Sequence, residues 1–61
     1  MQINVSDYES ISYVRFNNPL AFDLTQIKQC SINGSIFEVE THSGSIAYYR
    51  KDNILMKKKA S

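Results

Sequence analysis

Residues 29–50 read QCSINGSIFEVETHSGSIAYYR, and two glycine-containing pairs divide this stretch into largely alternating apolar segments. The first pair, Asn33-Gly34, predicts a two-residue type I′ hairpin turn with positive φ at both positions, which Asn and Gly adopt most readily. Such a turn would place Cys30 opposite Phe37. Because side chains alternate along a strand, one face then collects four apolar residues and is predicted to be the inner one. They are Cys30, Ile32, Phe37 and Val39.

The second pair, Ser43-Gly44, predicts another turn of the same kind. It would place Val39 opposite Tyr48, so that Ile46 and Tyr48 also belong to the predicted inner face. The two turns agree on which face is buried, and this agreement favours the prediction.

The next break is Lys51-Asp52-Asn53, which predicts a three-residue loop with Asn53 in the left-handed region. Ile54 would then pair with Arg50 and Met56 with Tyr48, which adds both apolar residues to the inner face. The resulting meander has four predicted strands, at about 27–32, 35–41, 45–50 and 54–58.

The predicted outer face of this meander is not cleanly polar. Apolar residues are interspersed with the polar ones, at Ile27, Ile36, Ala47, Tyr49 and Leu55. A sheet with one solvated face would not expose so many apolar side chains. We therefore expect the N-terminal strands, a second copy of the chain or a partner to cover part of this face.

The first half of the chain is less sharply patterned. The segment ISYVRF predicts a strand at about 10–16, and MQINV alternates as a further strand would. Residues 19–31 have two interpretations. In one, Asn18 caps a helix that begins at Pro19. In the favoured one, Leu20 to Leu24 alternate as a strand and Asp23 caps one short turn.

The predicted fold class is therefore mainly β. We expect an antiparallel meander of about four to six short strands curled into a small barrel or half-barrel, with one short helical turn near 23–29. The alternative is an α+β fold with a helix at 19–31. In its turn spacing the favoured fold resembles SH3-like barrels, a topological resemblance without a family motif, so no functional residue is transferred from them.

Length and composition predict one small domain, 1–61, ending in a basic tail at 57–61. A chain of 61 residues has a small core, and its single cysteine cannot form an internal disulfide. A small core and apolar groups on both faces favour a twofold homodimer. The sequence has neither a secretory leader pattern nor an apolar run near the roughly 20 residues that span a bilayer. We therefore expect a cytoplasmic protein without membrane contact.

The residues that could carry chemistry are few. His42 lies two positions from Glu40 on one predicted face, but as a residue beside an open turn it is expected to be solvated. Cys30 is predicted to be a buried core residue rather than a nucleophile. No ligand spacing for a metal and no glycine-rich phosphate loop occur in the sequence. We therefore predict a protein that is not an enzyme and has no catalytic residue, cofactor or metal.

The leading functional prediction is a small binding module that acts on a partner protein as an inhibitor, adaptor or regulator. Its length of 61 residues suits a small accessory protein of a phage or another mobile element. An aromatic residue beside apolar and charged neighbours is typical of an interface hot spot. The predicted partner-binding residues are Tyr49, Glu38, Glu40, Ile36 and Leu55.

The alternative is a small β-barrel that binds nucleic acid. The segment YYRK and the later KKK combine aromatic and basic residues, as single-strand-binding surfaces do. The residues predicted for this role are Arg50, Lys51, Lys57, Lys58 and Lys59.

Overall fold

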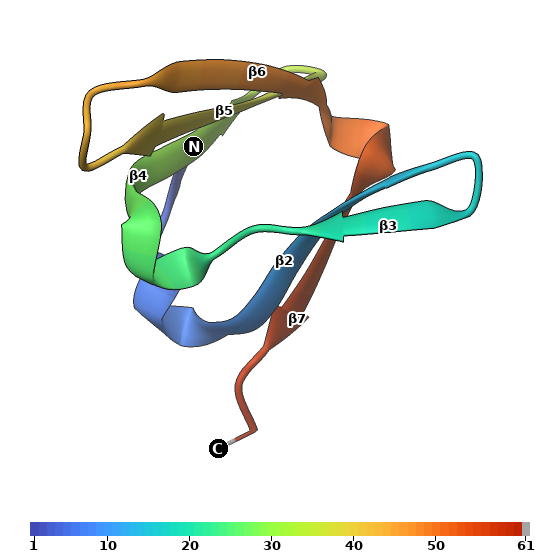
Figure 1. Ribbon diagram of the computed structural model, residues 1–61, viewed down its shortest axis with the longest axis horizontal. Helices are drawn as coiled ribbons and strands as arrows, with labels where there is room; N and C mark the ends of the chain where they lie inside the picture. Colours follow the sequence, from blue (N-terminus) through green and yellow to red (C-terminus); the bar gives the residue numbers. More distant parts are fainter. Residues whose placement is uncertain (61) are drawn as a thin grey trace.

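A computed structural model describes residues 1–60 and shows a mainly β domain made of two antiparallel sheets (Figure 1), which confirms the predicted fold class. The sheets pack against each other but do not close into a barrel. The larger sheet has the strand order β1-β4-β5-β6. Its strands are Gln2–Ile3 (β1), Ile27–Asn33 (β4), Ile36–Thr41 (β5) and Ile46–Arg50 (β6).

The smaller sheet has the order β3-β2-β7. Its strands are Tyr8–Arg15 (β2), Asn18–Ala21 (β3) and Ile54–Lys58 (β7). Three single turns of 3-10 helix connect the strands: Val5–Asp7 (η1), Leu24–Gln26 (η2) and Lys51–Asn53 (η3). No helix among residues 1–60 is long and apolar enough to cross a bilayer.

The turn between β4 and β5 lies one residue later than predicted. Asn33 pairs with Ile36, so Gly34 and Ser35 form the two-residue loop. Gly34 has a φ of 59°, whereas neither Asn33 nor Ser35 has a positive φ. The predicted positive φ at Asn33 was therefore wrong, and the φ signs fit a type II′ turn with glycine in its first central position.

This correction moves each pairing by two residues, which leaves the inner face unchanged. Cys30 pairs with Val39 and Ile32 with Phe37, instead of Cys30 with Phe37. Because side chains alternate with a period of two, a shift of two keeps all four on the same face. The predicted inner face of these two strands is thus confirmed although its register was wrong.

The second hairpin differs by one residue, and the consequence is larger. The Gly44 N–H donates to the Thr41 carbonyl at 3.0 Å and the Thr41 N–H donates to the Ser45 carbonyl at 2.9 Å. The loop therefore holds three residues and ends at Gly44, whose φ is 92°, as in hairpins that end with a left-handed residue and a bulge. The shift of one residue turns β6 over.

The predicted inward positions of Ile46 and Tyr48 were therefore wrong. Both side chains are exposed, while Ala47 and Tyr49 point inward and are half-buried. Tyr49 pairs with Phe37, and Tyr48 pairs with Glu38.

The third predicted hairpin does not exist. Lys51–Asn53 forms the 3-10 turn η3, which carries the chain from the larger sheet to the smaller one. The following strand, β7, pairs with β2 instead of β6: Ile54 lies opposite Tyr13 and Met56 opposite Ile11. Ile54 and Met56 nevertheless pack against the core, as expected.

The segment 19–31 contains a strand and one short turn, so the alternative helix at 19–31 was wrong. β3 returns along β2, and then Asp23 caps η2 by accepting a hydrogen bond from the Thr25 N–H at 3.1 Å. A bulge between Ile27 and Gln29 follows in β4. The extra residue, Lys28, turns Ile27 to the inner face, where it is buried, so the predicted outward position of Ile27 was also wrong.

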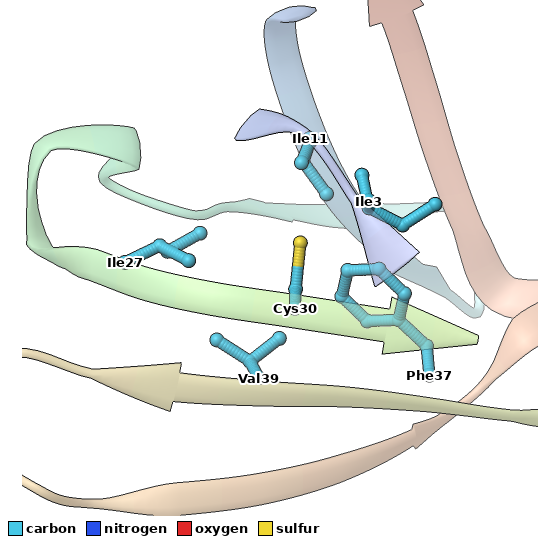
Figure 2. Close-up of a cluster of buried hydrophobic side chains, with 6 residues drawn as sticks. All are labelled: Ile3, Ile11, Ile27, Cys30, Phe37 and Val39. Atoms are coloured by element: carbon cyan, nitrogen blue, oxygen red, sulfur yellow. The ribbon is translucent and has the colours of Figure 1, made fainter. Parts of the chain in front are cut away.

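The core lies between the two sheets (Figure 2). Strands β1, β2, β4 and β5 each contribute to it. Its buried members are Ile3, Ile11, Ile27, Cys30, Phe37 and Val39. Cys30 is a buried free cysteine. Burial raises the pKa of its thiol by desolvation, which keeps the sulfur in its protonated, unreactive form at neutral pH.

The hairpin between β2 and β3 extends beyond the rest of the smaller sheet (Figure 1). Its tip, Phe16-Asn17, has φ values of 55° and 59°, the signs required of a type I′ turn. A bulky residue with positive φ is unusual. The Phe16 side chain is 88% exposed, and the Arg15 guanidinium lies 4.9 Å from the centre of its ring. Phe16 therefore adds nothing to the core.

Candidate interaction surface

Across β5 and β6, one face of the larger sheet points away from the core, and within residues 1–60 it carries exposed side chains. Strand pairing places Ile36 beside Arg50, Glu38 beside Tyr48 and Glu40 beside Ile46 across β5 and β6. We call these six residues the outer face. Three of the predicted partner-binding residues, Ile36, Glu38 and Glu40, lie on it together.

Three large apolar side chains of the outer face are accessible to solvent. Ile36 is 41% exposed, Ile46 52% and Tyr48 64%. Exposed apolar residues that share one face of two paired strands are more informative than the same residues scattered singly over the surface. Ile46 and Tyr48 were missed as site residues because the predicted register placed them inside.

The two carboxylates of the outer face lie between the apolar residues. Glu38 and Glu40 are half-buried on alternate positions of β5. The Gln29 side-chain amide donates to Glu40 Oε1 at 2.6 Å, which orients that carboxylate on the sheet surface. The carboxylates of Glu38 and Glu40 give the face an acidic strip along β5. Ile46 and Tyr48 of β6 lie beside this strip, and Arg50 lies near one end of it.

Tyr49 occupies a different environment from the one predicted. Its ring centre lies 5.2 Å from that of Tyr13 and 5.1 Å from that of Phe22, in tilted and edge-to-face arrangements. Such contacts are favourable aromatic geometries. The predicted neighbour Glu38 lies on the opposite face, beside Tyr48. Tyr49 thus joins the two sheets from inside.

Leu55, the remaining predicted partner-binding residue, belongs to the smaller sheet. It is 63% exposed and lies in β7 opposite Ser12. It therefore does not share the outer face, and any contact through Leu55 would use a second surface.

The basic residues predicted for nucleic-acid binding are divided between two ends of the molecule. Lys57 and Lys58 are part of β7, opposite Ser10 and Tyr8 at the start of β2, and Lys59 follows them. Lys57 lies 3.8 Å from a carboxylate oxygen of Glu9, with both side chains largely exposed. Residue 61 of the predicted 57–61 tail lies outside the described residues.

Arg50 and Lys51 lie at the other end of β7, before Ile54. Arg50 lies near Arg15, a residue that was not predicted as part of a site. Arg15 and Arg50 line one groove between the β2–β3 hairpin and the end of β6, and its remaining lining is largely aromatic. The other lining residues are Tyr13, Tyr48, Tyr49 and Asn53. Neither arginine forms an ion pair within residues 1–60.

The two residues considered as candidates for chemistry, His42 and Cys30, lie in different parts of the molecule. His42 is exposed in the loop after β5, whereas Cys30 is 2% exposed inside the core. In the part of the chain that the structure describes, no group of three or more His, Cys, Asp or Glu side chains is placed to hold a metal ion. The outer face and the groove at its end are two of the surfaces open to a ligand, and His42 lines another open pocket, with Thr25, Gln26, Thr41, Ser43 and Ser45.

Comparison with protein-family models, with curated proteins and with solved structures finds no match to this chain.

Proposed function

We propose that this chain is a non-enzymatic binding module that engages a partner protein through its outer face and acts on it as an inhibitor, adaptor or regulator in the cytoplasm. One observation carries the proposal. Ile36, Ile46 and Tyr48 expose large apolar side chains on one face of the sheet, where they alternate across the strands with Glu38, Glu40 and Arg50. Apolar side chains surrounded by polar ones are the usual composition of a protein-binding patch.

Within this surface Tyr48 has the properties of an anchor. It is the most exposed of the three apolar residues and lies in the middle of β6, beside Glu38. Tyrosine is enriched among residues that dominate binding energy because it combines a large apolar body with a polar tip. In this proposal Tyr48 takes the role predicted for its neighbour Tyr49. Glu38 and Glu40 favour a partner surface with basic side chains.

Photo-cross-linking tests the proposal. A benzophenone amino acid in place of Tyr48 should capture one discrete protein from cells of the source organism, because the probe lies within the proposed contact. The same probe at Thr25, an exposed residue of η2, is the control and should not capture it. With the captured protein purified, Tyr48→Ala should weaken binding by at least about 1 kcal/mol. Equal capture from both positions would contradict the proposal.

Nucleic-acid binding is a second candidate because of the groove that holds Arg15 and Arg50. Two arginines among tyrosines match the composition of single-strand-binding grooves. The acidic neighbour Glu38, beside Tyr48, opposes a phosphate at that side of the groove.

Fluorescence polarisation with a labelled single-stranded oligonucleotide distinguishes the two candidates. A protein-binding module should show no affinity, at low salt or at high salt. A nucleic-acid-binding protein should bind with steep salt dependence, because phosphate contacts release counterions. In that case Arg15→Ser with Arg50→Ser should abolish binding. The Lys57/Lys58/Lys59→Ser variant should retain most of it, because these lysines lie at the other end of β7.

A further inference from the structure

The four sheet edges of this molecule differ in how they are protected against pairing with another chain. β1 has only two residues, β3 contains Pro19, and β7 carries Lys57 and Lys58. Short strands, proline and lysine are the devices that block edge-to-edge association. The fourth edge, β6, has none of them from Ile46 to Tyr49, and its pairing with β5 shows no bulge. β6 is therefore the unprotected edge.

The backbone groups of β6 follow a fixed alternation. The Thr41 N–H donates to the Ser45 carbonyl and the Lys51 N–H donates to the Ser35 carbonyl, both at 2.9 Å. Residues between Ser45 and Lys51 must then alternate between bonding towards β5 and pointing away from it. The N–H and C=O groups of Ile46, Tyr48 and Arg50 point away. Ile46 and Tyr48 have no backbone bond from a turn or loop within residues 1–60. Arg50 differs, because it is the N-cap of η3 and its carbonyl accepts the first hydrogen bond of that turn.

We propose that β6 pairs antiparallel with β6 of a second copy of this chain, about a twofold axis at Tyr48. This deepens the homodimer prediction by naming its strand and its register. Tyr48 would then lie opposite Tyr48 of the second copy, and Ile46 opposite Arg50. Tyr48 gains partners for both its N–H and its C=O, and the Ile46 carbonyl accepts from the Arg50 N–H of the other copy. The Ile46 N–H lies opposite the Arg50 carbonyl, which already accepts one bond in η3.

Charge supports this direction of pairing over the parallel one. On the outer face Glu40 lies beside Ile46, at the opposite end of β6 from Arg50. The twofold axis brings Arg50 of one copy next to Ile46 of the other, two strand spacings or about 10 Å from Glu40, which the two long side chains can bridge. Arg50 and Glu40 have no ion pair within the part of the chain that the structure describes. A parallel pairing would instead bring the two copies of Arg50 together.

The pairing also has a consequence for the outer face. It joins the outer faces of two copies into one continuous surface, on which the two Tyr48 side chains meet at the centre and each Ile46 lies beside Arg50 of the other copy. Edge pairing further extends the four-stranded sheet of each copy, and association is a common way for a small domain to gain stability.

Sedimentation across a range of concentrations tests the pairing. The wild-type chain should be a dimer at tens of micromolar and dissociate on dilution. Tyr48→Pro should weaken self-association at least about tenfold, because it removes an outward-pointing N–H that the β5 ladder does not use. Tyr48→Val retains the N–H and β propensity, and its self-association should stay closer to that of the wild type. Circular dichroism confirms that each variant is folded.

A charge exchange tests the register independently of the proline variant. Arg50→Glu and Glu40→Arg should each reduce self-association, because like charges then meet across the axis. An equimolar mixture of the two should associate, because every mixed contact joins opposite charges. A wild-type chain that stays monomeric, a Tyr48→Pro variant that dimerises unchanged or a mixture that fails to associate would each overturn the pairing. The Tyr48 cross-link to a different protein would remain a separate test of the partner proposal.

Discussion

Replacing Phe37 by alanine is expected to lower the free energy of unfolding by about 3 to 5 kcal/mol, the cost of truncating a fully buried phenylalanine. Phe37 is 0% exposed, lies in the middle strand of the β4–β5–β6 meander and has the Phe22 ring 6.3 Å from its own. Small domains are stable by about 5 to 15 kcal/mol, so this one change should remove much of the total. Urea unfolding followed by circular dichroism measures the loss.

Phe16→Ala is the matched control because it makes the same substitution at a side chain that is 88% exposed. Its effect should stay under about 1 kcal/mol, because the ring lies on the surface and its contact with the Arg15 guanidinium is an exposed cation–π pair. Equal losses at Phe16 and Phe37 would contradict the placement of the core between the two sheets.

The inner face of β4 and β5 could be predicted from sequence, because its apolar alternation is unchanged by a register error of two residues. The turn at Gly34 is one residue later than Asn33-Gly34 suggests, which moves each pairing by two residues. A shift of two preserves the face, so Phe37 and Val39 were correctly placed inside. The alternation of apolar residues predicted the buried face correctly, although the Asn33-Gly34 pair predicted the wrong register.

The face of β6 could not be predicted in the same way. A Ser-Gly pair suits both a two-residue turn and the end of a three-residue loop, and the two differ by one residue. The hydrogen bonds of Thr41 to Gly44 and Ser45 show that the longer loop forms. The shorter turn predicted from Ser43-Gly44 assigned Ile46 and Tyr48, the most exposed apolar residues of the outer face, to the core. Ile36, Glu38 and Glu40 were correctly predicted on the outer face, because they lie in β5, before this turn.

The strand that pairs with β7 could not be predicted from the neighbouring sequence, for a different reason. Its strand limits, 54–58, were predicted well, because they depend on local propensity. Its neighbour depends on whether Lys51–Asn53 folds as a tight loop or as a 3-10 turn that leads to the other sheet. Pairing β7 with β2 joins segments that are far apart in the chain, and no local pattern of the sequence encodes that choice.

The adjacent residues Tyr48 and Tyr49 provide the sharpest test of this β6 register. Tyr49→Ala is expected to cost about 2 to 3 kcal/mol of stability, somewhat less than a fully buried aromatic, because Tyr49 is half-buried. Part of that loss comes from its ring contacts with Tyr13 and Phe22, since such pairs contribute about 0.5 to 1.5 kcal/mol beyond area burial.

Tyr48→Ala makes the same substitution one residue earlier, on the opposite face, where the side chain is 64% exposed. Its effect on the unfolding free energy should be under about 1 kcal/mol. Its effect on binding, to the captured partner or to a second copy, should exceed that of Tyr49→Ala when both variants are measured in their folded state. Thermal and urea unfolding of the two variants at a concentration where both are monomeric separates stability from association. If Tyr48→Ala caused the larger loss of stability and Tyr49→Ala the smaller one, β6 would have the register predicted from sequence, and the outer face would lose the residues on which its proposed role depends.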